Sequence, residues 1–391
     1  MFRIKYDGVR LSRQDWVENW RISRMRSYEV HKFKDLRRVA IASQFPLSKE
    51  QKEQIDDLYL SFYGEKIDYV WHQNYAAHAG QFDYRFIPEL IYIPEFETFM
   101  NQNIAAKEIM SDKNFLPLLA KSVNVKMPKT IVSCTNGIFR DGENCLIDVQ
   151  KATKLLKESG RFFIKPSVDS SSGQGCMKVE EHDVFHFNQG SLYFDNLYKR
   201  RYSKNFVCQE IVTCHNSISQ IYSGSVNTFR VISYLWRDKI EMMPIIIRIG
   251  QGGNYLDNAH AGGMFCAVYD DGSMGSHAVT EDNVQFKEHP DSHVIFSNHK
   301  IDNLDKVIDA AKRMHSLIPQ IGVVNWDFTI NEEGEALLIE ANVKNGSIWL
   351  PQMAHGTGAF GERTEEVLQW LRFMKKLKPH ERHLYVAGRM K

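Results

Sequence analysis

The chain has 391 residues, of which 43% are hydrophobic and 25% are charged, and its formal net charge is +1. This length allows two or three domains with sizeable cores, and the composition excludes a disordered chain and a globally basic nucleic-acid-binding protein. No apolar run approaches membrane-spanning length, the N-terminus lacks the apolar core of a signal peptide, and the six cysteines include no CxxC pair, so we expect a cytoplasmic protein with reduced thiols.

The first 100 residues are expected to form a helical, aromatic-rich region. Residues 1–40 contain eleven Lys and Arg against five Asp and Glu, which indicates either a solvated basic helix over 11–38 or attraction to an acidic ligand or membrane surface. Ser48 and Gln51 form a capping box for a second helix. The aromatic stretch 67–95 could fill a core or stack a sugar ring, and a core is the more usual role.

A regular alternation of helices and strands begins at Asp112. Strands are predicted at 161–165 and 176–179, joined by the loop PSVDSSSGQG. The small residues Ser170, Ser171, Ser172 and Gly173 suit a phosphate-binding nest, and Lys165 at the end of the entering strand could reach phosphates as a point charge. No helix follows the loop, so it is a hairpin flap and not a Walker A motif; the alternative is a plain surface hairpin.

The second half of the chain is predicted to contain several apolar strands. The run 206–212 carries Gln209 and Glu210, and its backbone could hold an adenine edge. The strands at 227–236 and 242–250 carry Arg230 and Arg248, and arginines in apolar strands require a phosphate or carboxylate partner. Helices are predicted at 303–318 and 364–376. His289 and His293 have zinc-like spacing, but Pro290 argues against a shared helix.

A hairpin at 322–347 carries the predicted metal ligands. At strand period, Trp326 and Phe328 point to one side and Asp327 to the other. On the return strand we expect Leu337, Ile339 and Ala341 on the apolar face and Leu338, Glu340 and Asn342 opposite. Asp327, Glu340 and Asn342 should then converge, and two carboxylates with an amide oxygen suit Mg²⁺. The alternative is a hairpin with one solvated face.

These features occur in the order typical of ATP-grasp enzymes. The closer resemblance is to the sugar-transfer-associated ATP-grasp group, and it is carried by WHQNY, DKN at Asp112, NTFRV, RIGQGGNYLDNAHAGG, WDF and IEAN, over residues 45–376. The resemblance implies an α+β ATP-grasp fold with two lobes that hold ATP. We expect an N-terminal region at 1–100 that could bind the acceptor, lobes at 101–210 and 211–376, and a basic tail at 377–391.

The resemblance also implies roles for individual residues. Mg²⁺ would bind Asp327, Glu340 and Asn342, and Arg248, Arg230 and Lys165 would be the catalytic cations, with Arg248 facing the transferring phosphoryl group. The expected ATP contacts are Lys113 and Lys165 at the phosphates, Ser170, Ser171, Ser172 and Gly173 in the flap, Gln209, Glu210, Ile211 and Val212 at the adenine, and Asn216 at the ribose, where many relatives carry an acid.

The activity implied is ATP-dependent ligation of a carboxylate to an amine through an acyl phosphate, with release of ADP. Such chemistry depends on charge neutralisation and in-line placement and requires no protein nucleophile. The expected partners are a small-molecule or glycan carboxylate, such as an acidic sugar of polysaccharide synthesis, and an amine or amino acid, with no nucleic acid. The alternatives are a kinase that phosphorylates a sugar or other hydroxyl, and a non-catalytic nucleotide-binding scaffold.

Overall fold

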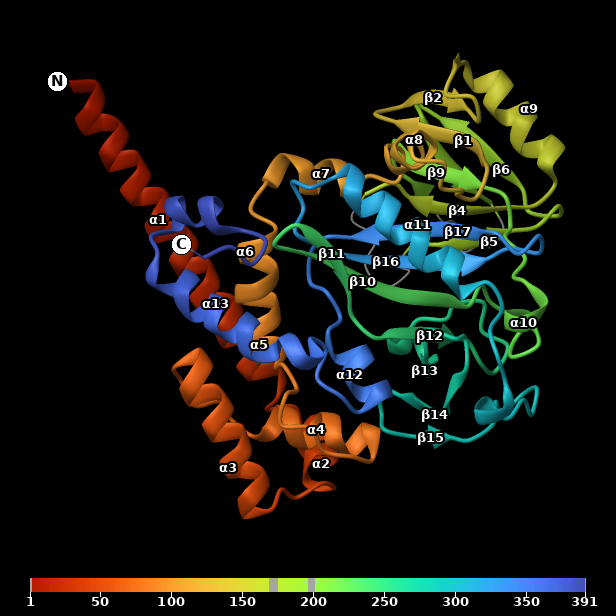
Figure 1. Ribbon diagram of the computed structural model, residues 1–391. Helices are drawn as coiled ribbons and strands as arrows, with labels where there is room; N and C mark the ends of the chain where they lie inside the picture. The colour runs from red at the N-terminus through yellow and green to blue at the C-terminus, as the bar shows by residue number, and fades with distance from the viewer. Residues whose placement is uncertain (1, 169–174, 196–200, 391) are drawn as a thin grey trace.

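The computed structural model describes residues 2–168, 175–195 and 201–390, and it contains three β-sheets with helices around them. The smaller lobe lies at the upper right in Figure 1, the largest sheet occupies the centre, and the N-terminal helices pack at the left together with the C-terminal ones. The mixed α+β architecture that the sequence predicts is confirmed.

The helices have the following bounds: α1 Phe2–Lys32, α2 Leu36–Ser43, α3 Lys49–Leu58, η1 Tyr59–Tyr63, α4 Val70–Ala79, α5 Glu89–Ile91, η2 Tyr92–Glu97, α6 Thr98–Met100, α7 Ile104–Ser111, α8 Leu116–Ser122, α9 Val149–Ser159, α10 Asn216–Ser219, η3 Ala259–Ala261, η4 Phe296–Asn298, α11 Leu304–Leu317, α12 Trp349–His355, η5 Gly361–Arg363, α13 Thr364–Lys376 and η6 Pro379–Tyr385. The capping box expected at Ser48 and Gln51 is present at the start of α3.

The smaller lobe is an antiparallel six-stranded sheet with the order β3-β2-β1-β9-β4-β5. Its strands are β1 Thr130–Thr135, β2 Ile138–Asp141, β3 Leu146–Ile147, β4 Phe162–Pro166, β5 Met177–Val179 and β9 Asn205–Gln209. Buried side chains of α9 and of the sheet form its core. The predicted pairing of β4 with β5 is confirmed, but the strand expected to run to Val212 ends at Gln209, because the chain leaves the sheet there and crosses to the larger lobe.

A three-stranded antiparallel sheet adjoins this lobe. Its strands are β6 Phe185–Asn188, β7 Ser191–Phe194 and β8 Arg201–Tyr202. Phe185 and Phe194 come from its first two strands and pack in the same apolar core as the six-stranded sheet. The small sheet is therefore an extension of the smaller lobe and has no separate core among the described residues.

The larger lobe is built on an eight-stranded antiparallel sheet with the order β15-β14-β13-β12-β10-β16-β17, in which β11 also pairs with β10. Its strands are β10 Thr228–Trp236, β11 Lys239–Met242, β12 Ile245–Ile249, β13 Met264–Val268, β14 Met274–Thr280, β15 Gln285–Phe286, β16 Val323–Ile330 and β17 Ala336–Asn342. One face packs against α11, where Phe229, Trp326 and Phe328 are fully buried. On the opposite face, Ile232 and Tyr234 pack against the N- and C-terminal helices, and the polar residues described below occupy the remainder.

The return strand of the hairpin differs from the prediction before Glu340, where Leu337 and Leu338 lie on the opposite faces from those expected. The register shifts between Asp327, which pairs with Glu340, and Phe328, which pairs with Leu338. Ile339 is therefore the extra residue of a bulge, and Leu338 lies in the apolar core instead of sharing a face with Glu340. Strict period-2 alternation fails here because the extra residue of a bulge moves all residues beyond it along the strand to the other face of the sheet.

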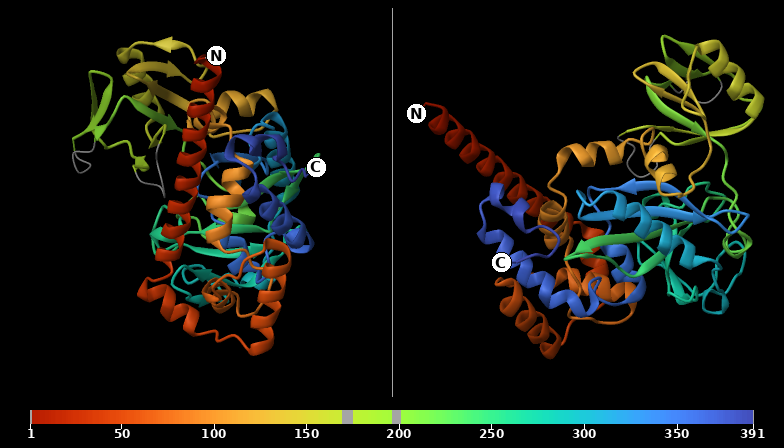
Figure 2. Two further views of the ribbon diagram at one scale, coloured as in Figure 1. Left: turned by 90° about the vertical axis from the view of Figure 1, so that its left-hand side faces the viewer. Right: turned by 45° about the horizontal axis from the view of Figure 1, so that its top comes forward.

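The aromatic stretch 67–95 fills a core and does not offer a sugar-stacking platform. Trp71, His72, Tyr75 and Phe86 are buried, and Trp71 and Tyr75 pack in one cluster with Phe265 of β13. The same region contacts the C-terminal helices, since α4 packs on α12 and η1 packs on α13. These helices thus form one body with the larger sheet (Figure 2).

Candidate functional site

The pairing of four strands places the polar residues of the larger sheet on one face. Arg230 on β10 lies opposite Asp327 on β16, and Asp327 in turn lies opposite Glu340 on β17. Thr228 on β10 lies opposite Arg248 on β12. The other face of these strands is apolar and buried, so the alternation of side chains directs the charged groups together toward the smaller lobe.

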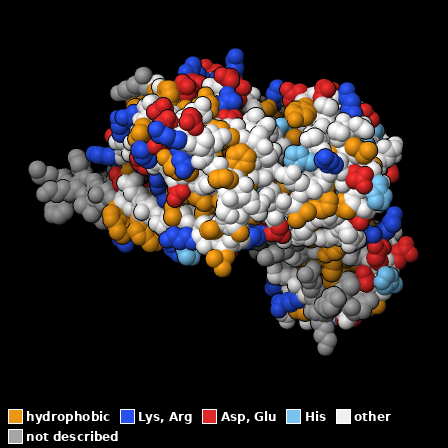
Figure 3. All heavy atoms as spheres, turned by 90° about the horizontal axis from the view of Figure 1, so that it is seen from below, with side chains coloured by type: hydrophobic (Ala, Val, Ile, Leu, Met, Phe, Trp, Pro, Cys, Tyr) orange, Lys and Arg blue, Asp and Glu red, His pale blue; other side chains and the backbone are white. Residues whose placement is uncertain are grey.

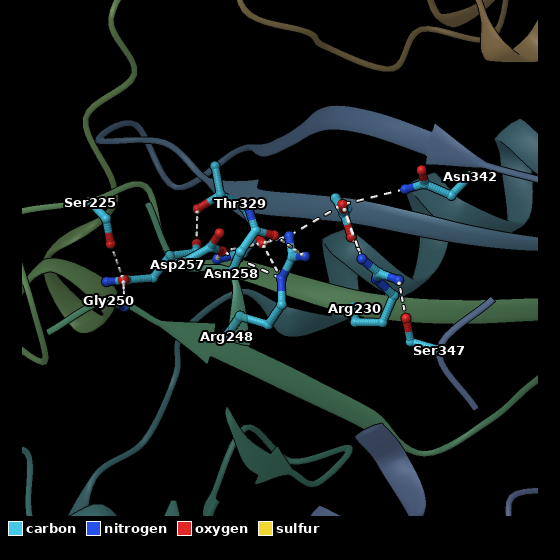
Figure 4. Close-up of polar contacts among 12 residues, drawn as sticks. Ser225, Arg230, Arg248, Gly250, Asp257, Asn258, Thr329, Asn342 and Ser347 are labelled. Carbon is cyan, nitrogen blue, oxygen red and sulfur yellow. Dashed lines mark hydrogen bonds and ion pairs between the residues drawn. The ribbon is translucent and has the colours of Figure 1, made fainter. Parts of the chain in front are cut away.

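Asp327 is the centre of this arrangement. Its Oδ1 accepts a hydrogen bond from Arg230 Nε at 2.7 Å. Its Oδ2 is contacted by three donors: another Arg230 nitrogen at 3.3 Å, Arg248 at 3.2 Å and Asn342 Nδ2 at 3.5 Å. Arg230 and Arg248, labelled in Figure 4, thus reach one buried carboxylate from neighbouring strands. The partner that the sequence requires for each arginine is Asp327.

Arg248 has a second carboxylate neighbour that the sequence prediction omitted from the site. Its Nε lies 3.5 Å from Asp257 Oδ2 and 3.1 Å from Thr228 Oγ1, and Asn258 Oδ1 accepts another of its N–H groups at 3.0 Å. Burial lowers the pKa of Arg248, but the nearby carboxylates outweigh burial and leave that pKa above its ordinary value. Burial raises the pKa of Asp257. The signal for Asp257 was its position in the glycine-rich loop after the Arg248 strand.

Two buried lysines complete the cluster. Lys165 comes from β4 of the smaller lobe, and Lys113 comes from the segment between α7 and α8, two helices that pack in the core of the larger sheet. Lys113 Nζ lies 3.0 Å from Glu340 Oε1, and the Lys113 backbone N–H donates to Ser167 O at 2.8 Å, which joins the lobes across the site. Lys165 on β4 is only 6% exposed. Among the residues that the structure describes, no carboxylate lies within ion-pair distance of Lys165, and burial lowers the pKa of its ammonium group.

The segment that connects the lobes carries the residues predicted at the adenine and ribose. The Gln209 side chain is buried and donates to Pro128 O at 3.1 Å. Glu210 is exposed, and both its backbone N–H and its carboxylate bond to the backbone of Lys129 at 2.9 Å. Ile211 and Val212 are half-buried. The Glu210 carboxylate therefore stabilises the connection between the lobes. We expect any adenine contact from this segment to come from the backbone of Ile211 and Val212.

Other predicted residues lie elsewhere. Asn216 is exposed at the start of α10. The flap residues Ser170, Ser171, Ser172 and Gly173 lie outside the described residues. His289 is buried with Nε2 2.9 Å from Gly250 O, whereas His293 is exposed beside Glu288, and these separate environments do not join the two imidazoles.

The donor set fits a magnesium ion only with a small rearrangement. The described residues contain no group of three His, Cys, Asp or Glu side chains arranged to hold a metal. However, Asp327 Oδ1 accepts a single hydrogen bond and retains a lone pair, since a carboxylate oxygen has two. Glu340 is 27% exposed. Rotation of the Asn342 side-chain amide would exchange its nitrogen and oxygen, so that the oxygen faces Asp327 and Glu340. Asp327, Glu340 and Asn342 would then present only oxygen atoms, which are the ligands that Mg²⁺ prefers.

The charge balance of the cluster favours an anion. Four cationic side chains, Lys113, Lys165, Arg230 and Arg248, surround three carboxylates, Asp257, Asp327 and Glu340. Charges removed from water are costly unless paired. A polyanion such as a triphosphate would pair the excess positive charge, and a bound divalent cation would pair the carboxylates at the same time.

Comparison with known proteins bears on the same residues. The model of a family described as sugar-transfer associated ATP-grasp matches residues 94–368. No curated protein matches the sequence. No helix of the described chain has the length and apolar character needed to cross a bilayer.

Similar solved structures include carboxyaminoimidazole ribonucleotide synthase from Aspergillus clavatus complexed with ATP, with 10% identity, a TM-score of 0.38 and coverage of 62% of this chain and 47% of that one. D-alanyl-alanine synthetase A from Vibrio cholerae has 15% identity and a TM-score of 0.38, with coverage of 68% and 66%. The chain thus spans about half to two thirds of these structures' lengths. Likenesses this distant do not bear on activity.

Proposed function

Because the chain belongs to the sugar-transfer-associated ATP-grasp family, we propose that it is an ADP-forming ligase that joins a carboxylate to an amine through an acyl phosphate. The observation that carries this proposal is the buried cluster of Lys113, Lys165, Arg230 and Arg248 around the Asp327–Glu340 pair. Such a cluster is suited to the triphosphate of ATP, and its position between the two sheets is where an ATP-grasp fold holds the nucleotide.

Lys113 and Lys165 would bind the phosphates of ATP. Lys165 is already buried without a carboxylate at ion-pair distance among the described residues, so a phosphate would provide the missing counter-charge. Lys113 is oriented by Glu340 and by the backbone of Ser167. The two side chains therefore approach the nucleotide in a fixed direction, which favours binding because little conformational freedom is lost.

Arg230 and Arg248 would stabilise the charge that moves during transfer. Both guanidinium groups are held by Asp327, and Arg248 is held again by Thr228 and Asn258. Donors fixed in advance in a buried site stabilise a developing negative charge with little reorganisation. Because each arginine has five N–H donors, both retain donors for phosphoryl oxygens while they remain bonded to Asp327.

Asp327, Glu340 and Asn342 would hold Mg²⁺. A bound Mg²⁺ supplies charge neutralisation at the β- and γ-phosphates of the nucleotide. The protein's part is to keep two carboxylates adjacent through the β16–β17 register. Backbone groups of Ile211 and Val212 would contact the adenine.

In the proposed reaction, a carboxylate oxygen of the acceptor forms a bond to the γ-phosphorus while the bond to the β-bridging oxygen breaks, and ADP leaves. The amine then attacks the acyl carbon, phosphate leaves with the bonding electrons of the anhydride, and a proton of the amine passes to the surrounding medium. Positioning and charge stabilisation are the whole contribution of the protein to the first step.

For the substrate, we propose an acidic sugar or a polysaccharide precursor as the carboxylate and an amine or amino acid as the nucleophile. The description of the family, which concerns sugar transfer, supports the sugar. The aromatic stretch 67–95 lends no support, because its large rings are buried in the core.

The test is incubation of the full chain with ATP, MgCl₂, hydroxylamine and a panel of uronic acids and other carboxylated sugars, followed by measurement of hydroxamate and ADP. Equal amounts of hydroxamate and ADP with one acid would establish the acyl phosphate. A Glu340→Gln variant should lose both products, whereas exchange of an exposed residue, Lys157→Met, should lose neither.

Other outcomes would overturn the ligase proposal. Acceptor-dependent ADP with a stable phosphorylated product and no hydroxamate would show a kinase. Binding of ATP without any acceptor-dependent ADP across the panel would favour the non-catalytic scaffold.

A further inference from the structure

Helix α1 projects from the body of the protein in Figures 1 and 2. Its described acidic and basic side chains are divided between two faces. Among the described side chains of α1, those of 13 and 15–32, every acidic residue is turned inward and paired. Asp15 contacts His380 at 2.7 Å and Glu18 contacts Arg382 at 3.2 Å. Glu29 is buried and lies 2.8 Å from Lys32. The contacts with His380 and Arg382 anchor the helix to the C-terminal segment, and Lys32, which lies 3.1 Å from Glu89 Oε1, connects it to α5.

The outward face of α1 carries aromatic and basic side chains. Trp16, Trp20 and Tyr28 are 66%, 51% and 63% exposed, although large aromatic rings are normally covered. Arg13, Arg21 and Arg24 are exposed beside them, and Arg24 lies over the Trp20 ring at 5.5 Å. None of the exposed residues among the described side chains of this helix is acidic.

These groups form one continuous stripe. Trp16, Trp20 and Arg24 follow each other at intervals of four, and Arg13 and Tyr28 extend the row in both directions, so helical geometry stacks them along one side. Figure 3 shows that hydrophobic side chains are also exposed next to Lys and Arg side chains, with some Asp and Glu, on the left-hand part of the described surface seen from below. We call Arg13, Trp16, Trp20, Arg21, Arg24 and Tyr28 the outward stripe.

We propose that the outward stripe docks this protein onto an anionic phospholipid membrane surface. Tryptophan and tyrosine rings favour the boundary between headgroups and acyl chains, where their apolar bodies are buried and their polar atoms stay solvated. The arginines of the outward stripe would lie at the level of the lipid headgroups, and the electrostatic attraction to anionic headgroups increases with each arginine. The helix lies along the surface in this arrangement and does not cross it.

Charge distinguishes this partner from a second copy of the chain. A two-fold interface would place the outward stripe against itself, and Arg13, Arg21 and Arg24 would then face like charges, which opposes association. A membrane rich in anionic lipid presents the complementary sign along the whole stripe. The proposal is independent of the ligase activity, because the stripe contains none of the residues of the candidate site.

The test is co-sedimentation of the full chain with vesicles of phosphatidylcholine alone and of phosphatidylcholine with one third phosphatidylglycerol. We expect binding to the anionic vesicles only, and weaker binding at high salt. The triple variant Arg13→Glu, Arg21→Glu, Arg24→Glu should bind at least about a hundredfold more weakly. The matched control Lys121→Glu, Lys239→Glu, Lys312→Glu makes the same change in net charge on other exposed residues and should bind almost as wild type does.

A second pair of variants tests the aromatic contribution. Trp16→Glu with Trp20→Glu should abolish binding, whereas Leu146→Glu, at another exposed apolar position, should preserve it. Absence of binding by the wild-type chain, or equal binding by the triple variant and its control, would overturn the proposal. Failure to bind vesicles together with a dimer in analytical ultracentrifugation that either outward-stripe variant converts to monomer would also overturn it and assign the stripe to self-association.

Discussion

Replacement of Lys165 by Met separates a nucleotide-binding role from a structural one, because the two measurable effects have opposite signs. Lys165 is 6% exposed, and burial lowers the pKa of its ammonium group. A group with a lowered folded-state pKa opposes folding wherever the unfolded chain carries the charge, which for lysine includes pH 7. Lys165→Met removes that charge and keeps much of the volume, so we expect the ligand-free protein to gain on the order of 1 kcal/mol in the free energy of unfolding.

The same variant should bind ATP more weakly. A charge-assisted contact to a phosphate contributes about 2 kcal/mol, which corresponds to a rise in the dissociation constant of roughly thirtyfold. Calorimetric titration with ATP and MgCl₂ measures the affinity, and urea unfolding measures the stability. The pairing with Glu340 is unaffected, because Lys113 and not Lys165 contacts that carboxylate.

Two other lysines provide the comparison for this experiment. Lys113→Met should weaken ATP binding and also destabilise the protein, because it leaves the Glu340 carboxylate without its partner at 3.0 Å. Lys157→Met, on the exposed side of α9, should change neither quantity. An unchanged dissociation constant for Lys165→Met would refute the phosphate assignment. A loss of stability with intact affinity would show that Lys165 acts only in the fold.

Three further predictions follow from buried carboxylates. Asp327→Asn should lower the free energy of unfolding by about 3 kcal/mol, because two buried arginines lose their shared counter-charge, and it should abolish turnover in the ADP assay. Asp257→Asn should cost less stability, about 1–2 kcal/mol, because Arg248 keeps its contact with Asp327. Burial raises the pKa of Glu97 from 4.5 to about 7, so its contribution to stability should decline by about 3 kcal/mol as the pH rises from 4.5 to 7.

Urea unfolding across this pH range checks the last prediction, and Glu97→Gln should flatten the dependence because the titrating carboxylate is removed. A pH dependence identical in wild type and variant would contradict it. Equal stability of Asp257→Asn and Asp327→Asn would contradict the view that Asp327 is the shared partner of both arginines. Wild-type turnover by Asp327→Asn would contradict its metal role.

Local patterns in the sequence determined the elements and the pairs that lie close along the chain. The capping box at Ser48 fixed the start of α3 because both of its hydrogen bonds form within four residues. The alternation of Asp327 with Trp326 and Phe328 placed the carboxylate opposite the core, since strand geometry alone decides this. Arginines in apolar strands likewise required an anionic partner, a phosphate or a carboxylate, before any partner was known.

The sequence did not determine which groups meet across lobes or strands. Lys113 and Glu340 are far apart in the chain and form a contact only because α7 and α8 pack against the larger sheet that carries Glu340. The bulge at Ile339 reversed the expected side of Leu338, because its insertion depends on pairing with β16 and leaves no local signal. The basic N-terminal segment was ambiguous in sequence. Only the packing of Asp15, Glu18 and Glu29 against the body shows that one side of α1 is left basic and aromatic, because burial and pairing of charges are properties of the folded molecule and not of residue order.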